Sequence, residues 1–155
     1  MLREAVGALV ALQMACGAAL ADTDSDAAKK VGLYGAWSLF DCTKLELSPL
    51  WVFAETSAGK LETYTQLPSG KLLNRSTVRN VRSAGGNLVS YETIHDKGTS
   101  FFTVALVEKQ LQVMESRNSL GEVLITGGRV AFGGRGEVQR YTRCSRGGER
   151  SVRPD

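Results

Sequence analysis

The chain has 155 residues, of which 43% are hydrophobic and 23% charged, and its formal net charge is +3. This composition is typical of one folded domain, and it excludes a disordered chain, a collagen-like repeat and a disulfide-dense miniprotein. The sequence holds a single histidine. That count weighs against a histidine-rich metal site and against most histidine-based catalysis.

The first 21 residues have the pattern of a secretory signal peptide. Arg3 gives a positive start, an apolar run follows over 5–15, and residues 19–21 form a small-x-small cleavage site. We therefore expect cleavage after Ala21 and a periplasmic or secreted protein. Lipid attachment at Cys16 is the alternative. A membrane anchor is disfavoured because polar residues begin at Asp22, too early for a segment of about 20 apolar residues.

Removal of this segment leaves two cysteines, Cys42 and Cys144. An even pair in an exported chain favours a disulfide, and this one would close most of the domain. Loop-closure entropy would then stabilise the fold by roughly 4 to 5 kcal/mol. Two unpaired buried thiols are the alternative.

The rest of the chain is divided into short runs rich in valine, threonine and aromatic residues, separated by turn residues. After a polar leader over 22–34, this pattern predicts antiparallel strands over residues 35–144. The expected strands are Ala36 to Glu46, Leu50 to Thr56, Lys60 to Gln66, Lys71 to Ser83, Asn87 to His95, Thr99 to Glu108, Gln110 to Ser116, Glu122 to Thr126 and Gly136 to Cys144. The strand from Lys71 to Ser83 is long enough to bend or to count as two.

Short connections make strands that are adjacent in sequence adjacent in the sheet, so we expect an up-and-down meander. Eight or nine such strands either close into a barrel or fold as a sandwich. The presumed disulfide would join the first strand to the last, which favours the barrel. We therefore predict an all-β fold, an antiparallel meander closed as a barrel of about eight strands, followed by a basic, flexible tail over 145–155.

The expected first strand opens with Gly35-Ala36-Trp37. A Gly-x-Trp at this point, the hairpin-linked strands and a late basic residue resemble the calycin barrels, lipocalins above all. The resemblance implies that Trp37 closes the barrel floor and that a late arginine packs over it. The candidates are Arg140, Arg143 and Arg146. If Cys42 and Cys144 face each other in a ladder, Trp37 lies near Glu149, which favours Arg146 or Arg150. Small periplasmic barrels that inhibit lysozymes or proteases resemble the chain equally well.

No residues of this chain assemble into a convincing catalytic, metal or cofactor site. His95-Asp96 with Ser100 is better explained as a hairpin turn than as a triad. The alternating aspartates at 22, 24 and 26 lack the glycine and distal glutamate of a calcium loop. The glycine pairs are not followed by a helix that could hold phosphate. We expect no enzymatic activity and no cofactor.

Aromatic residues and one methionine are the candidate ligand contacts, in a cavity or as core filling. They are Trp37, Trp51, Phe53, Tyr64, Tyr91 and Met114. We therefore expect a monomeric, exported binding protein, a lipocalin-like carrier of a small apolar ligand or lipid. The alternative is a protein-binding module, an inhibitor or an accessory subunit of an envelope complex, that uses a loop end or the outer face of Phe101 to Val107. The C-terminal arginines could contact an anionic surface, whereas nucleic acid is not expected.

Overall fold

The computed structural model describes residues 23–40, 42–132 and 136–144. Its elements, in chain order, are α1 (Asp24–Val31), β1 (Gly35–Ser38), the 3-10 helix η1 (Cys42–Leu47), β2 (Leu50–Glu55), β3 (Leu61–Gln66), β4 (Leu72–Gly85), β5 (Leu88–His95), β6 (Gly98–Val107), β7 (Gln110–Asn118), β8 (Val123–Thr126), β9 (Arg129–Val130) and β10 (Arg140–Cys144). Within this described part, no helix is long and apolar enough to cross a membrane.

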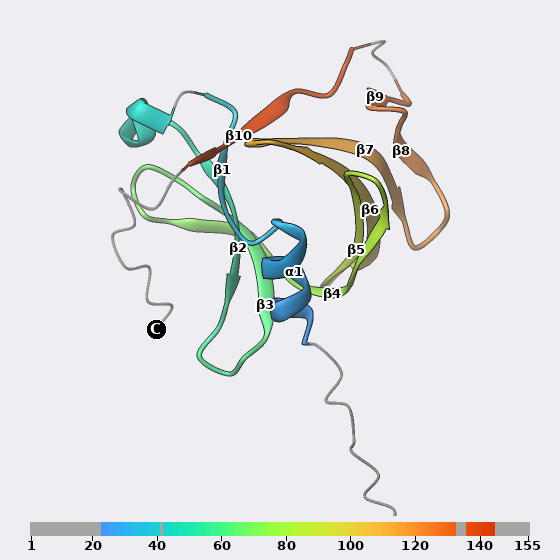
Figure 1. Cartoon of the computed structure of the whole chain (residues 1–155), viewed down its shortest axis with the longest axis horizontal. Coiled ribbons are helices and arrows are strands. Elements are labelled where there is room, and N and C mark those ends of the chain that lie inside the picture. The colour runs from blue at the N-terminus through green and yellow to red at the C-terminus, as the bar shows by residue number, and fades with distance from the viewer. Residues whose placement is uncertain (1–22, 41, 133–135, 145–155) are drawn as a thin grey trace, which may run out of the picture.

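Eight of the strands form a closed antiparallel barrel, as the sequence predicted. Strands β1 to β7 follow one another as a meander, and β10 pairs with β1 on one side and with β7 on the other. The β8–β9 hairpin pairs with the far half of β7 and extends from the barrel beyond that strand (Figure 1). The predicted fold class is confirmed.

The barrel interior is built by the alternating residues of each strand. Directly paired residues in an antiparallel ladder share a face, and the pairs Trp37↔Trp51 and Val89↔Val104 both point inward. Fully buried Phe53, Leu61 and Val78 join them in one apolar core. In β5, the buried residues Val89, Tyr91 and Thr93 alternate with less buried neighbours, as expected for a strand with one face on the core.

Helix α1 covers one end of the barrel (Figure 1), although residues 22–34 were expected to be a solvated leader. The Thr23 hydroxyl accepts a hydrogen bond from the Asp26 N–H at 3.2 Å, and Gly32 ends the helix with φ of 81°. These are strong helix-start and helix-stop signals. Ala28 is completely buried in the core. The polar composition of this segment concealed a helix that buries Ala28 in the core. The prediction of a polar, solvated leader was therefore wrong.

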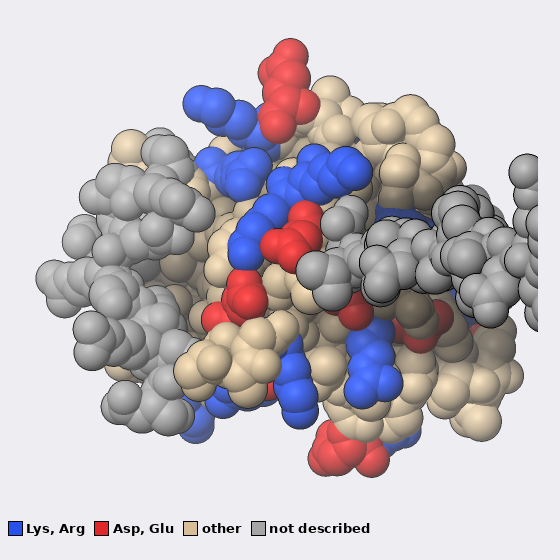
Figure 2. All heavy atoms as spheres, turned by 60° about the horizontal axis from the view of Figure 1, so that its bottom comes forward, with Lys and Arg blue, Asp and Glu red and all other residues tan. Residues whose placement is uncertain are grey.

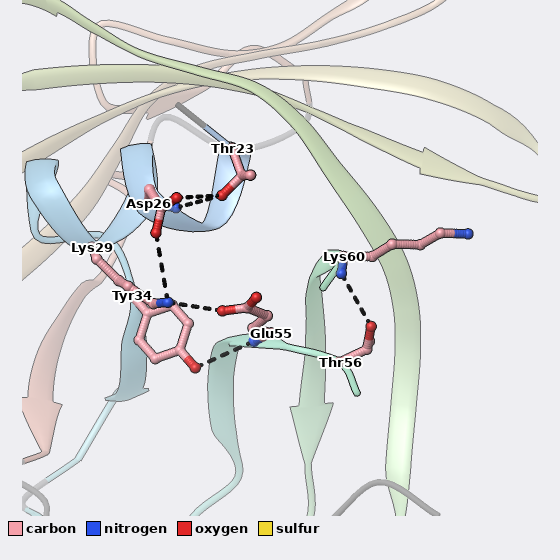
Figure 3. A network of polar contacts seen from close by, with 7 residues as sticks. All are labelled: Thr23, Asp26, Lys29, Tyr34, Glu55, Thr56 and Lys60. Atoms are coloured by element: carbon pink, nitrogen blue, oxygen red, sulfur yellow. Dashed lines mark hydrogen bonds and ion pairs between the residues drawn. The ribbon is translucent and has the colours of Figure 1, made fainter. Parts of the chain in front are cut away.

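A polar network fixes α1 to the strand ends (Figure 3). The Lys29 ammonium lies 2.8 Å from the Glu55 carboxylate at the end of β2, and the Glu55 N–H donates to the Tyr34 hydroxyl at 3.3 Å. The hydrogen bond to Glu55 is the main cause that raises the pKa of Lys29. At the first residue of the helix, the Asp24 carboxylate accepts a hydrogen bond from the Val81 N–H of β4 at 3.0 Å.

The first strand is shorter than predicted. It ends at Ser38, whose hydroxyl accepts a hydrogen bond from the Phe40 N–H at 3.1 Å. Such a local serine bond turns the chain out of the extended conformation. Cys42 therefore lies at the start of η1, and its placement in the first strand was wrong.

The predicted disulfide between Cys42 and Cys144 is present, with a Cα–Cα distance of 5.3 Å. It joins η1 to the end of β10 rather than lying within a ladder. The partner of Cys144 across the sheet is Ala36, and Trp37 pairs with Arg143. The register that placed Trp37 near Glu149 was therefore wrong.

Candidate functional site

The predicted site residue Trp37 seals the core beneath α1. Its side chain is buried, and its indole N–H donates to the Leu33 carbonyl at 3.0 Å. The Arg143 guanidinium lies 5.6 Å from the Trp37 ring and donates to the Tyr34 carbonyl at 2.7 Å. The basic residue over the tryptophan is thus Arg143, one of the three original candidates. The preference for Arg146 or Arg150, both outside the described residues, was wrong because it rested on the incorrect register.

Three further candidates belong to a chain of touching aromatic rings that crosses the barrel. Trp51 lies 5.1 Å from both Phe53 and Tyr141, and Tyr91 lies 5.5 Å from Phe53 and 5.2 Å from Phe102, measured between ring centroids. These separations are those of directly packed rings. The predicted contacts Trp51, Phe53 and Tyr91 thus pack in one chain of rings together with Tyr141 and Phe102, which were not among the predicted contacts.

The remaining two candidates, Tyr64 and Met114, lie apart from this chain. Tyr64 pairs with Val52, on the sheet face opposite to Trp51 and Phe53. Met114 sits at the register shift between the pairs Thr103↔Glu115 and Val104↔Val113 of β6 and β7. The structure therefore brings four of the six residues together and separates two.

A polar tyrosine hydroxyl ends up inside the aromatic core. Tyr91 is 2% exposed, and among the described residues its hydroxyl has no hydrogen-bond partner. Burial raises its pKa well above the usual value of a tyrosine. Tyr64 and Tyr141 also have a raised pKa, again because burial disfavours the charged phenolate.

An open cavity of about 350 Å³ lies along the middle of β4, β5, β6, β7 and β8. Of the six predicted ligand contacts, only Tyr91 lines it. The register shows which face carries the cavity. The row Arg82↔Ser90↔Thr103↔Glu115 and the neighbouring row Arg79↔Glu92↔Phe101↔Arg117 share one face, whereas the alternate residues Tyr91 and Phe102 pack in the core. We call this the charged cavity, defined by Arg82, Glu92, Glu115 and Arg117.

Exposed apolar side chains gather beside this cavity. Among the described residues, eight large apolar side chains are strongly exposed, and five of them fall within 120–132. These five, Leu120 (84%), Val123 (43%), Leu124 (42%), Val130 (43%) and Phe132 (68%), lie on β8, β9 and the adjoining turns. We call them the apolar hairpin.

The outer face of Phe101 to Val107, proposed from the sequence as an interaction surface, is covered in part. Phe101 is half-buried beneath the Arg117 guanidinium, 5.1 Å from its ring, whereas Val107 at the end of the strand is exposed. Sequence reasoning missed the charged cavity and the apolar hairpin. The apolar run Val123-Leu124-Ile125 could have indicated the apolar hairpin from the sequence. Successive residues of a strand point to opposite faces, so an unbroken apolar run in a short outer strand leaves apolar side chains exposed on at least one face.

The charged side chains give no single-sign surface on the face shown in Figure 2, where lysine and arginine lie interspersed with aspartate and glutamate. Among the described residues, no group of three or more histidine, cysteine, aspartate or glutamate side chains could hold a metal ion. His95 lies at the β5–β6 turn, where its ring accepts a hydrogen bond from the Lys97 N–H at 3.2 Å. The turn predicted at His95-Asp96 is confirmed.

The signal peptide with Cys16 and the C-terminal tail both lie outside the described residues. Comparison of the chain with known protein families, with characterised proteins and with solved structures gives no match.

Proposed function

We propose that this protein is a non-enzymatic binding module that associates with another protein through the apolar hairpin. The observation that carries the proposal is the concentration of five of the eight strongly exposed large apolar side chains in residues 120–132. In a soluble monomer, such side chains are scattered singly, whereas contiguous ones mark contact sites. The same residues contribute little to the core, so their apolar character calls for another explanation.

The alternative of a lipocalin-like carrier of a small apolar ligand receives less support from the interior. A carrier needs space beside its aromatic walls. Trp51, Phe53, Tyr91 and Phe102 instead contact one another at ring distances of 5.1 to 5.5 Å. Core filling accounts for these side chains without a ligand. The contrast between a packed interior and an apolar outer hairpin favours the protein-binding alternative.

The disulfide favours a partner in an oxidising compartment. Disulfides persist in the periplasm and in secreted proteins and are rare in the cytosol. A disulfide between Cys42 and Cys144 is therefore consistent with export by the predicted signal peptide. We propose an envelope or secreted protein as the partner.

A photo-crosslinking amino acid at Phe132 tests this proposal in the cells that make the protein. We expect an adduct with one distinct protein at Phe132 and none with the crosslinker at Ser83, an exposed position on β4. Leu124→Glu should abolish the adduct, because a charge would be buried without a partner in the interface. Since Leu124 is exposed, the variant should keep its unfolding free energy within about 0.5 kcal/mol.

The same experiment, combined with native mass spectrometry, distinguishes a ligand carrier from a protein-binding module. Equal labelling at Phe132 and Ser83, together with a retained lipid or metabolite in native mass spectra of the purified protein, would overturn the partner-binding proposal and favour ligand carriage.

A further inference from the structure

The β8–β9 hairpin carries apolar side chains on both of its faces. Directly paired residues in an antiparallel ladder share a face. Buried Ser116 of β7 pairs with Ile125, and Ile125 pairs in turn with Val130. The next residue of β7, Arg117, faces outward and pairs with Val123. Val123 and Val130 therefore lie on opposite faces of the hairpin.

A register shift between β7 and β8 produces this arrangement. Val123 and Ile125 are two residues apart and would share a face in a regular strand. The pairing shifts between Ser116 and Arg117, which leaves Leu124 as an extra residue in β8. Such a bulge redirects side chains, and here it leaves Ile125 on the core side while Val123 lies on the outer face. Val123 on one face and Val130 on the other are each 43% exposed.

One face of the hairpin is too small for a stable interface. The hairpin extends from the barrel beyond β7, so a partner can reach it from two sides (Figure 1). β8 has four residues and β9 has two. At about 3.3 Å per residue and about 4.8 Å per strand, one face covers roughly 130 Å², whereas a standard interface takes about 800 Å² from each partner. Contact with both faces and with the flanking turns brings the buried area closer to that value.

Arg129, the basic residue of β9, has no carboxylate partner. In the described part of the chain it forms no ion pair within 4.0 Å. Glu137 lies opposite Arg129 in an isolated bridge, but its carboxylate lies 3.6 Å from the Arg140 guanidinium and accepts a hydrogen bond from the Gln112 amide at 3.2 Å. The planar donors of an arginine match a carboxylate, so Arg129 is suited to bind one from outside the chain.

The acidic residue of the segment 120–132 is also bound within the chain. The Glu122 carboxylate accepts a hydrogen bond from the Asn118 amide at 2.6 Å. Arg129 precedes Val130 and therefore points to the opposite face, the outer one. The outer face of the hairpin thus combines an apolar side chain, Val123, with a positive charge that a partner can neutralise.

We propose that the partner protein holds the β8–β9 hairpin in a cleft, with an apolar wall against each face and a carboxylate opposite Arg129. This inference rests on the proposed function and adds the shape and chemistry of the partner. The outer wall contacts Val123 and supplies the carboxylate, and the other wall contacts Val130. Stacked sheet layers lie about 10 Å apart, so the backbones of the two walls stand roughly 20 Å from each other.

Photo-crosslinking amino acids at Val123 and at Val130, in separate variants, test the cleft in the cells that make the protein. We expect both to label the protein that is labelled from Phe132, and mass spectrometry should locate the two adducts on different peptides of it. Val107, an exposed valine at the end of β6 (52%), is the matched control position and should give no adduct.

The outcomes separate this inference from the proposed function. Labelling from Phe132 but from only one of the two valines would overturn the cleft and leave the partner-binding proposal standing. Labelling of the same partner peptide from both valines, or an adduct with a phospholipid or a second copy of this chain, also contradicts the cleft. Without an adduct at any of the three positions, both proposals fall.

Arg129→Gln tests the carboxylate, with the partner purified after its identification by crosslinking. The dissociation constant should rise about two- to fivefold, the effect of one exposed ion pair, and the difference should shrink at high salt. Arg79→Gln makes the same charge change at an exposed position on β4 and should leave the dissociation constant unchanged. Equal dissociation constants for Arg129→Gln and Arg79→Gln would refute the carboxylate opposite Arg129.

Discussion

At the scale of single residues, the two tyrosines Tyr91 and Tyr34 differ in how their hydroxyl groups are used. The Tyr91 hydroxyl is buried without a partner among the described residues, whereas the Tyr34 hydroxyl accepts the Glu55 N–H at 3.3 Å. A buried hydroxyl without a hydrogen bond has lost its hydration and gained nothing in return. The two residues thus offer a matched test of polar burial in one molecule.

We expect Tyr91→Phe to leave the free energy of unfolding unchanged or to raise it slightly, because the ring contacts remain and an unsatisfied hydroxyl is removed. Tyr34→Phe should lower it by about 1 kcal/mol, since the Glu55 N–H loses its acceptor. Urea unfolding of both variants checks this. A larger loss in Tyr91→Phe than in Tyr34→Phe would mean that the Tyr91 hydroxyl has a partner, such as an ordered water.

Residue-level prediction from the sequence succeeded for Trp37 and failed for its arginine. The tryptophan could be identified because Gly-x-Trp is a local pattern. The arginine depends on which residues face each other across β1 and β10. The predicted register assumed that Cys42 lies in the ladder, but β1 ends at Ser38, and the observed pair is Trp37↔Arg143. The residue types after Trp37 do not reveal that β1 ends at Ser38, where the serine hydroxyl bonds to the Phe40 N–H.

At the scale of elements, α1 contributes to the core through few residues and depends on its ends. Ala28 is its buried apolar contact, and the helix has eight residues. Helices this short are unstable alone, so capping and docking decide whether they form. The Thr23 hydroxyl both accepts from the Asp26 N–H and donates to the Asp26 carboxylate at 2.8 Å.

We expect Thr23→Ala to destabilise α1 by about 1 kcal/mol through loss of the N-cap, with Thr23→Ser as a control that keeps the hydroxyl. Hydrogen exchange should show faster exchange in 24–31 of Thr23→Ala, while the amides of β5 and β6 stay protected. Uniformly faster exchange through the barrel would show instead that α1 and the barrel unfold as one unit.

The strands of the meander were the most predictable elements. The expected ranges for β2 to β8 agree with the structure to within two residues at each end, because Gly, Pro and Asn turns mark hairpins locally. The long β4 is one strand whose register shifts between Arg79 and Arg82. Such bulges set which charges share a row, so the charged cavity could not be derived from the alternation of residues alone.

At the scale of the whole molecule, buried phenols on three strands link stability to alkaline pH. Burial raises the pKa of Tyr64, Tyr91 and Tyr141, whereas an unfolded tyrosine ionises near about pH 10. Above that pH the unfolded chain holds fewer protons than the folded one. The free energy of unfolding therefore falls as the pH rises.

We expect the stabilisation to be complete below about pH 10 and to be lost progressively above it. Urea unfolding at intervals from about pH 8 to about pH 11 measures this, and Tyr91→Phe should make the decline less steep. If the variant and the original protein give the same pH profile, the Tyr91 phenol does not contribute to the alkaline loss.

The closure of the barrel by β10 has a consequence for the order of assembly. Strand β1 finds one of its two neighbours only in the last strand, with Ala36 opposite Cys144, and such distant pairings form slowly. Until β10 docks, the facing edges of β1 and β7 expose unpaired backbone groups to other chains. The disulfide anchors the end of β10 to η1, directly after β1, and so covalently locks the last seam of the barrel to form.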